Sequence, residues 1–318
     1  MPQSSIPPKA HKKLFEDLRY DIKKNKFLIL LSAPAILWFV LFAYVPLLGL
    51  IIAFQKFSPA RGILGSDFIG LKNFEFFFKS EAFLRVTFNT LFLNTLFIGF
   101  TMITSILIAL SLSEINTKLF KRVTQSVVIL PHFISWTVVA LLCEALFTVD
   151  RGLINRVLAG IGMEPVLFYQ NAKIWPGVLT ALRIWQGAGY GSIIYLATIT
   201  GFDKEMFEAA RIDGATRMQT IWHLTLPMLR PTAVILLLMS VGRIFNGDFG
   251  MIFAIIGNNT MLLPTTDVID TYVYRQLMEA SNIGMSSAIG LYQSVMGFIM
   301  VMGANALARK LDADSALF

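Results

Sequence analysis

Six long apolar segments restrict this chain to a membrane-spanning fold. They lie at residues 27–54, 86–112, 123–147, 174–200, 232–256 and 285–308. Each holds the roughly 20 residues that a helix needs to cross about 30 Å of hydrocarbon. Because lipid offers the backbone no hydrogen bonds, single segments of this length can only span as helices. The sequence therefore predicts an all-α polytopic membrane protein with six transmembrane helices.

The composition agrees with a membrane protein and excludes several other classes. Hydrophobic residues make up 55% of the 318 residues and charged residues only 15%, a balance far from that of soluble domains. The first apolar run is too long for a cleaved signal peptide and lacks a clear cleavage site. Cys143 is the only cysteine, so no internal disulfide can form. The aromatic residues lie in the apolar segments and not on a basic soluble domain, so we expect no nucleic-acid partner.

Lysine and arginine residues are distributed unevenly between the two sets of connecting segments. Residues 1–26, 113–122, 201–231 and 309–318 hold sixteen of the 27, whereas the alternate connections hold nine. Because cytoplasmic segments carry the excess of positive charge, both termini and the 201–231 loop are predicted to be cytoplasmic. The net charge of +7 then reflects the topology of a protein in the bacterial cytoplasmic (inner) membrane, beside acidic lipid headgroups.

The chain divides into a tail and a membrane domain. Residues 1–26 form a basic cytoplasmic tail, and residues 27–318 form the six-helix domain. Leu14, Leu18 and Ile22 recur at helical spacing in the tail, which favours an interfacial helix. A mostly disordered positive anchor explains the same charges equally well.

The loop at residues 203–231 begins with the signals of a short helix and a sharp bend. Asp203 is placed to cap a helix over residues 204–213, and Glu208 lies toward its positive N-terminal end. Gly214 follows that helix and permits a bend that a residue with a Cβ atom would resist.

After the bend, the loop carries the signals of a second helical piece. Thr216 and Gln219 form a capping-box pattern that restarts a helix. We expect Pro227 and Pro231 to end that piece and to admit the next membrane helix at its first turn. The sequence thus predicts a helix, a bend and a second helix on the cytoplasmic side.

The run from Glu208 to Ala215, the pair Leu226–Pro227 and Pro231 stand at the spacing of a known motif. They resemble the EAA loop in the membrane-spanning subunits of binding-protein-dependent ATP-binding-cassette importers. The resemblance implies that this loop docks onto an ATPase subunit. The residues that it assigns to coupling are Glu208, Ala209, Ala210, Asp213, Gly214, Ala215, Ile221, Leu226 and Pro227. An amphipathic helix lying on lipid is the alternative interpretation of the loop.

Three other runs narrow the resemblance. Residues 185–197 are similar to the stretch that leads into the EAA loop of carbohydrate permeases, and residues 266–275 and 304–310 resemble the branch that imports oligosaccharides or polysaccharide fragments. The resemblance implies a type I importer permease with cytoplasmic coupling helices. It also implies a second homologous permease, two ATPase subunits and an extracytoplasmic solute-binding protein as partners. ATP and magnesium would serve the ATPase subunits, and this chain would need no cofactor.

Few polar side chains lie inside the fourth and fifth apolar segments, and several share a helical face. They are Arg183, Gln186 and Tyr190 in the fourth segment and Arg243, Asn246 and Asp248 in the fifth. Their donors and acceptors suit the hydroxyls of a sugar, and aromatic rings suit its flat C–H faces. These six residues are our candidates for the substrate path.

The two arginines have a second interpretation. Arg183 and Arg243 could be structural charges paired with Glu144 or Asp248, which would fix helix positions and leave the substrate uncontacted. If such pairs are absent, unpartnered arginines would favour an anionic substrate such as a uronate oligosaccharide.

No catalytic or metal site is predicted. His11, His132 and His223 lie far apart in the chain, so they suggest no metal-ligand cluster. His132 follows Pro131, and it either faces the cavity or is satisfied beside a proline kink. The chain contains no G-x-x-x-x-G-K-[ST] motif, so we expect it to be a transport subunit and not an enzyme.

An alternative function is a self-contained secondary transporter or channel. Such a protein could couple to an ion through Glu144, Asp248 and Arg243. It would have no use for a docking loop at residues 203–231. A membrane scaffold without transport is a weaker third interpretation.

Overall fold

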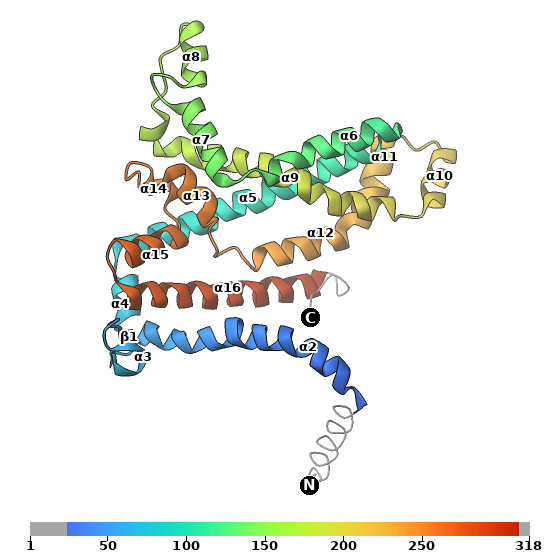
Figure 1. The fold of residues 1–318 in the computed structure, drawn as a ribbon. Helices are drawn as coiled ribbons and strands as arrows, with labels where there is room; N and C mark the ends of the chain where they lie inside the picture. Colours follow the sequence, from blue (N-terminus) through green and yellow to red (C-terminus); the bar gives the residue numbers. More distant parts are fainter. Residues whose placement is uncertain (1–23, 312–318) are drawn as a thin grey trace.

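The computed structural model describes residues 24–311, which form a helical protein (Figure 1). The α-helices are α2 (Lys26–Phe39), α3 (Gly62–Gly65), α4 (Lys72–Phe78), α5 (Glu81–Ser113), α6 (Lys118–Ile129), α7 (Trp136–Phe147), α8 (Leu153–Gly160), α9 (Trp175–Thr200), α10 (Lys204–Ile212), α11 (Arg217–Thr220), α12 (Leu226–Val241), α13 (Phe249–Ile256), α14 (Leu263–Thr266), α15 (Ile269–Met278) and α16 (Ile283–Leu311). The π-helices are η1 (Val40–Tyr44) and η6 (Ile221–Thr225), and the 3-10 helices are η2 (Val45–Phe54), η3 (Leu130–Phe133), η4 (Phe168–Gln170) and η5 (Ala172–Ile174). Within residues 24–311 the only strands are β1 (Gln55–Lys56) and β2 (Asp67–Phe68), which pair antiparallel.

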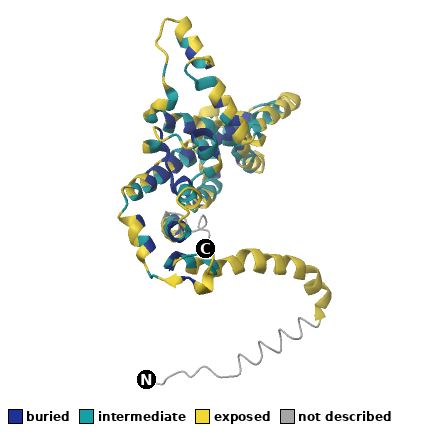
Figure 2. Cartoon of the chain, turned by 60° about the vertical axis from the view of Figure 1, so that its left-hand side comes forward, coloured by how far each residue is buried: buried dark blue, intermediate teal, exposed yellow. Residues whose placement is uncertain are grey.

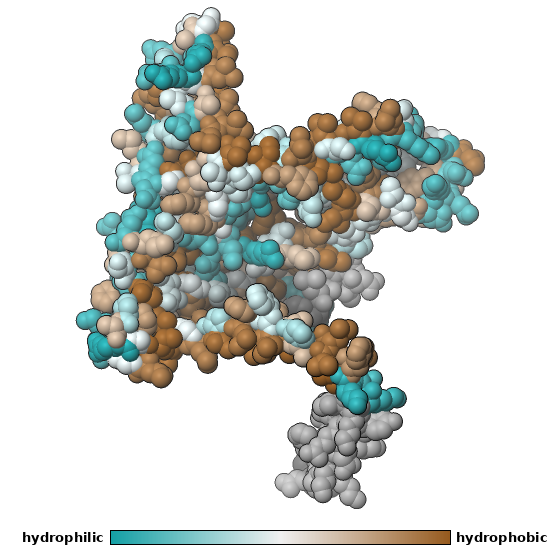
Figure 3. Space-filling model, in the orientation of Figure 1, coloured by the Kyte–Doolittle hydropathy of each residue, from teal (hydrophilic) through white to brown (hydrophobic). Residues whose placement is uncertain are grey.

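Four stretches are long and apolar enough to cross a membrane, which confirms the all-α membrane class. They are Lys26–Phe54, Glu81–Ser113, Arg217–Val241 and Ile283–Lys310. A bent pair made of α6 with η3 and of α7 raises the number to five if it counts as one span. The long helix α9 is not among them, so the predicted number of six spans is not confirmed. Hydrophilic residues gather at opposite ends of the molecule, over α10 and over β1 and α3 (Figure 3).

The prediction of one continuous span at residues 123–147 is wrong. The helix breaks after η3 and bends by 92° before α7 begins. Pro131 has no N–H to donate to the preceding turn, which weakens the helix there. Ser135 then caps α7 by accepting a hydrogen bond from the Val138 N–H at 3.4 Å. The apolar run therefore contains two helices in different directions.

The predicted span at residues 232–256 is also wrong at both ends. The helix that contains α12 begins at Arg217 and continues to Val241, so Pro227 and Pro231 do not end the preceding piece. The wide π-turn η6 precedes Pro227 and loosens the turn that the proline ring would otherwise clash with. Beyond α12 the chain turns through residues 242–248 before α13 begins.

Helix α5 lies at the centre of the fold. It contributes to all three hydrophobic clusters of the described chain, which also contain residues from α7, α9, α12, α13, α15 and α16. Two glycines in α9 let α6 and α5 approach that helix closely. A Cβ atom on Gly189 would lie 1.9 Å from the Val128 carbonyl oxygen of α6, and one on Gly191 would lie 2.6 Å from Ser105 Oγ of α5.

The first membrane helix stands apart from this core. The side chains of α2 are exposed on all sides in the isolated chain (Figure 2), whereas the following η2 packs against α16. Such an apolar surface suits lipid or a neighbouring subunit. Residues 1–23 lie outside the described residues, so the interpretation of the tail stays a prediction.

We predict that Gly189→Ala destabilises the assembled protein. The added methyl group must displace the Val128 carbonyl, and overpacking of this kind costs about 1–3 kcal/mol. The apparent melting temperature in detergent or nanodiscs should fall by several degrees. Gly99→Ala in α5 is the matched control, because a Cβ atom there meets nothing within 4 Å. Equal melting temperatures for the two variants would contradict the close packing of α6 on α9.

Candidate functional site

A cavity of about 830 Å³ lies between α5, α9, α12 and the turn that follows α12. The residues that line it are Asn94, Phe97, Ile98, Thr101, Met102 and Ser105 from α5, Arg183, Tyr190, Gly191, Ile194 and Tyr195 from α9, Leu236, Met239 and Ser240 from α12, and Arg243 and Asn246, Gly247, Asp248 and Phe249 beyond α12. The lining mixes apolar walls with a few polar groups, as ligand sites in proteins do.

Five of the six residues predicted for the substrate path line this cavity, and Gln186 does not. Gln186 is buried, and its side-chain amide donates a hydrogen bond to the Ile134 carbonyl oxygen at 3.1 Å. That carbonyl lies at the break between η3 and α7, where the helix supplies no donor. Gln186 therefore supports the bend.

The charges in the cavity do not cancel. Arg183 forms an ion pair with Asp248, with 3.1 Å between guanidinium nitrogen and carboxylate oxygen. This pair agrees with the structural interpretation of Arg183. Arg243 lines the same cavity and makes no ion pair within residues 24–311. Glu144, the other partner considered, lies on a second cavity with Tyr169. The lining side chains thus carry one uncompensated positive charge.

Two stacked rings stand beside the cavity. The imidazole of His132 and the ring of Tyr190 lie 4.2 Å apart between centroids, with an angle of 10° between their planes. His132 comes from η3, so the break in the third segment brings it to α9. Tyr190 lines the cavity and is half-exposed. The stacked pair presents a flat aromatic surface.

Side chains from three other helices hold the turn at residues 242–248. Asn94 Nδ2 of α5 donates to the Ile244 carbonyl at 2.9 Å and to the Asn246 carbonyl at 3.1 Å. Gln293 Nε2 of α16 donates to the Phe245 carbonyl at 2.8 Å. The Gly247 N–H donates to the carboxylate of Asp270 in α15. These bonds satisfy backbone groups of the turn that no regular helix satisfies.

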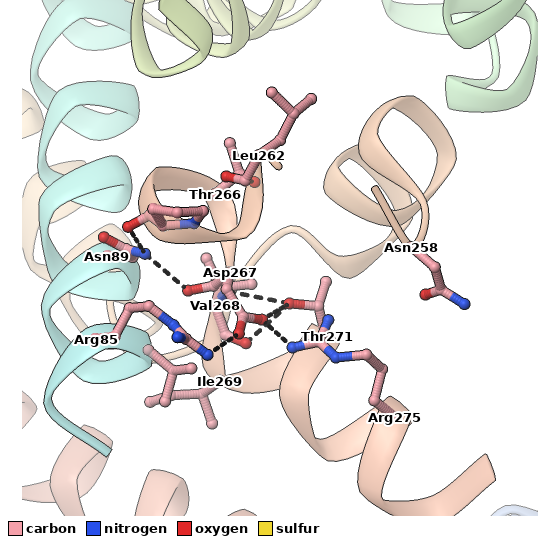
Figure 4. A network of polar contacts seen from close by, with 12 residues as sticks. Arg85, Asn89, Asn258, Leu262, Thr266, Asp267, Val268, Ile269, Thr271 and Arg275 are labelled. Atoms are coloured by element: carbon pink, nitrogen blue, oxygen red, sulfur yellow. Dashed lines mark hydrogen bonds and ion pairs between the residues drawn. The ribbon is translucent and has the colours of Figure 1, made fainter. Parts of the chain in front are cut away.

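A second network fixes α14 and α15 to α5 (Figure 4). Asp267 is fully buried between the two helices, and its carboxylate forms ion pairs with Arg85 and Arg275. Thr271 donates a further hydrogen bond to it at 3.0 Å. Asn89 donates to the Asp267 backbone carbonyl at 3.1 Å. These contacts offset the cost of burying the carboxylate.

Sequence reasoning missed the residues of these two networks. One signal was available for the second of them, since Asp267, Thr271 and Arg275 follow one another at four-residue spacing along a helix face. The asparagines of α5 gave a weaker signal, as amides within a strongly apolar helix. Their partners are 150 or more residues away in the chain, so spacing could not reveal them.

The part of the coupling loop from Asp203 to the capping box of α11 folds as the sequence predicts. Asp203 caps α10 by accepting from the Glu205 N–H at 3.0 Å, and Gly214 has a φ of +82°. Thr216 and Gln219 form a capping box at the start of α11. The bend is closed by the Ala215 N–H, which donates to the Ala210 carbonyl at 2.9 Å.

The nine residues assigned to coupling differ in exposure. Exposed residues are Glu208, Ala209, Asp213, Gly214 and Pro227, and partly buried ones are Ala210, Ala215, Ile221 and Leu226. Ile221 and Leu226 pack against the hydrophobic cluster of α5, α9 and α12, so they anchor the loop to the protein. Apolar side chains of the loop that remain free include Ile212, Met218 and Trp222, at 86%, 63% and 63% exposure.

The described part of the chain contains no group of three or more His, Cys, Asp or Glu side chains that could hold a metal ion.

The chain matches known transport proteins over most of its length. Residues 101–313 match the family model described as binding-protein-dependent transport system inner membrane component. Two relatives from Bacillus subtilis (strain 168) are the polygalacturonan/rhamnogalacturonan transport system permease protein YteP, 38% identical over 92% of this chain and 90% of its own, and the protein LplB, 36% identical over 92% of each chain.

A solved structure agrees with this assignment. A chain of a bacterial ABC transporter involved in the import of the acidic polysaccharide alginate superposes with a TM-score of 0.85. It is 34% identical, and the match covers 93% of this chain and 99% of that one. A second structure, of a bacterial alginate ABC transporter in complex with an alginate pentasaccharide-bound periplasmic protein, contains a chain that is 33% identical and superposes with a TM-score of 0.84. The chain thus belongs to the family of inner membrane components of binding-protein-dependent ABC transport systems, as one permease subunit that pairs with a second permease and with ATPases.

Proposed function

We propose that this permease subunit carries acidic oligosaccharides, such as uronate-containing fragments of polysaccharides, across the bacterial inner membrane. The observation that carries the proposal is Arg243, a cavity residue without an ion-pair partner in the described chain. The names of YteP and of the alginate transporter, whose substrates are acidic polysaccharides, support it.

The cavity offers each kind of contact that such a substrate needs. Arg243 can bind a carboxylate with two parallel N–H donors. Asn246 and Ser240 offer hydrogen bonds to hydroxyls, and Tyr190, backed by His132, offers a flat face to the C–H side of a sugar ring. A volume of about 830 Å³ falls within the range of drug-sized ligand sites, and the second permease would enlarge it.

The energy comes from partners that dock on the cytoplasmic loop. Ile212, Met218 and Trp222 give α10, α11 and η6 an apolar surface for an ATPase subunit, and Glu208 and Asp213 give it a charged edge. ATP and magnesium act on those ATPase subunits. Closure of the two ATPases moves the paired loops together, and this rigid-body motion opens the cavity toward the solute-binding protein.

This reading sets the orientation of the chain. Both termini and α10 face the cytoplasm, in agreement with the distribution of lysine and arginine residues. The turn after α13 and helices α14 and α15 then face the outside. Nothing found supports the ion-coupled alternative, because Asp248 is already paired with Arg183 and the family is that of binding-protein-dependent transport.

Replacing Arg243 should remove the preference for acidic substrates. We expect Arg243→Gln to lower ATPase stimulation by galacturonate oligomers roughly tenfold or more, since a hydrogen bond to a charged group contributes about 1.5–3 kcal/mol. Stimulation by methyl esters of the same oligomers should change less than about twofold. The assay uses the complete complex with saturating solute-binding protein.

Arg230→Gln is the control for this test, because Arg230 is an exposed residue of α12 that does not line the cavity. It should leave both responses unchanged. An equal loss for acids and esters in Arg243→Gln would contradict a role in charge recognition.

The bend of the cytoplasmic loop should be essential for coupling. A β-branched residue resists the φ of +82° at Gly214, at a cost of about 1–2 kcal/mol. Gly214→Val should therefore reduce ATP-driven uptake about tenfold without reducing the amount of protein in the membrane. Gly214→Asn should retain most uptake, since asparagine tolerates this conformation. Full uptake by the valine variant would contradict a role of the loop in coupling.

Cysteine labelling tests the orientation in sealed cells. In a Cys143→Ser background, Asn258→Cys should react with an impermeant thiol reagent, and Met218→Cys should react only after permeabilisation. Both positions are exposed in the structure, so access depends on the side of the membrane. The reverse pattern would overturn the proposed topology.

A further inference from the structure

The turn at residues 242–248 carries three of the charged and polar cavity residues on an irregular backbone. Arg243, Asn246 and Asp248 all belong to it. Its backbone is not α-helical: short turn hydrogen bonds run from the N–H groups of residues 243, 244 and 246 to the carbonyls of residues 240, 241 and 243. The directions of these side chains therefore depend on contacts from outside the turn as well as on these short bonds. Asn94 and Gln293 hold its first half through the carbonyls of residues 244–246.

The second half of the turn at residues 242–248 is held by Asp270. Its carboxylate oxygen Oδ2 accepts hydrogen bonds from the Gly247 N–H and from Gln293 Nε2, the latter at 3.0 Å. Gln293 also donates to the Phe245 carbonyl. Asp270 and Gln293 together therefore bond to the residues on either side of Asn246. Asp270 does not line the cavity itself.

Gly247 fits this contact because it has no side chain. An ideal Cβ atom at Gly247 would lie 2.9 Å from Asp270 Oδ2 and 2.7 Å from Val268 Cγ2. Contacts this short do not occur for real Cβ atoms. The turn therefore lies so close to the start of α15 that residue 247 has no room for a side chain.

Helix α15 is itself held rigidly against α5. The Ile269 N–H donates to Thr90 Oγ1 at 2.9 Å, and the ion pairs of Asp267 tie the preceding residues to Arg85 (Figure 4). Because Asp270 follows this anchored segment directly, its carboxylate has a fixed position relative to α5, which forms one wall of the cavity.

The electrostatic environment fits a carboxylate that acts through hydrogen bonds. Burial raises the pKa of Asp270 above its usual range, while the hydrogen bonds from Gly247 and Gln293 lower it and the neighbouring Asp248 raises it further. Among charged neighbours within the described chain, Asp248 is paired with Arg183. The two donors are thus what makes the buried carboxylate tolerable.

We propose that Asp270 is a positioning residue for substrate recognition: through Gly247 it fixes the turn that aims Arg243 and Asn246 into the cavity. The proposal concerns the geometry of the turn and rests on the proposed function only where the charge of the substrate is used as a readout. Asp270 acts through the turn, because it does not line the cavity itself.

Geometry and charge can be separated with two variants. Asp270→Ala removes both the charge and the acceptor, whereas Asp270→Asn removes the charge and keeps an acceptor oxygen for Gly247. We expect Asp270→Ala to lower the ratio of galacturonate-stimulated to ester-stimulated ATPase about fivefold or more. Asp270→Asn should keep at least the native ratio. If Asp270 acted only as a negative charge near the cavity, both variants would shift the ratio in the same direction, and the proposal would be wrong.

A second readout does not depend on the substrate. In the complete complex lacking Cys143, a cysteine at Asn246 reports the order of the turn through its rate of reaction with N-ethylmaleimide. We expect Asp270→Ala to raise this rate about tenfold and Asp270→Asn to leave it within twofold. Gln293→Leu should act like Asp270→Ala, and it replaces that variant if the alanine protein fails to assemble.

Thr271→Val is the matched control, because Thr271 is buried one residue further along α15 and bonds to Asp267 and not to the turn. It should lower the melting temperature of the complex without changing the labelling rate. Equal labelling changes in Thr271→Val and Asp270→Ala would overturn the proposal, as would no change in Asp270→Ala. A labelling difference together with no charge preference in any variant would uphold the positioning role and contradict the acidic substrate instead.

Discussion

The fold depends on the rule that backbone groups inside a membrane protein must find hydrogen-bond partners within the protein. Two of the apolar segments break, after η3 and after α12, and each break frees carbonyls and N–H groups. Buried amides satisfy them: Gln186 bonds to Ile134, and Asn94 bonds to residues 244 and 246. Helix α5 is central because its polar side chains reach the turn, α9 and α15, through Asn94, Ser105 and Thr90.

The same breaks create the candidate site. A straight fifth span would place Arg243, Asn246 and Asp248 along helix faces, whereas the turn brings all three to the lining of one cavity. Asp248 then neutralises Arg183 across the cavity, and Arg243 is left to carry its net charge. The break at η3 similarly delivers His132 to the face of Tyr190. The side chains proposed to recognise the substrate therefore reach the cavity because two helices are interrupted and other helices hold the breaks in place.

Sequence patterns predicted the features that depend on residues close together in the chain. The loop folds as expected from Asp203 to the capping box formed by Thr216 and Gln219. Caps, glycine bends and capping boxes involve residues within five positions of one another, so the sequence shows them directly. The expected stop at Pro227 failed, since the π-turn η6 accommodates the proline within a continuous helix. The breaks within residues 123–147 and 232–256 were missed because hydropathy stays high across both of them.

The sequence by itself determined that the chain is a helical membrane protein, which family it resembles, and which residues could form a polar cavity. It could not decide which of those residues face that cavity. Gln186 and Tyr190 share a helical face by spacing, yet one bonds to a distant carbonyl and the other lines the cavity. Only the tertiary structure chose Asp248 as the partner of Arg183 and Asp270 as the support of Gly247. Pairings of this kind join separate helices, and helical spacing carries information only about neighbours on the same helix.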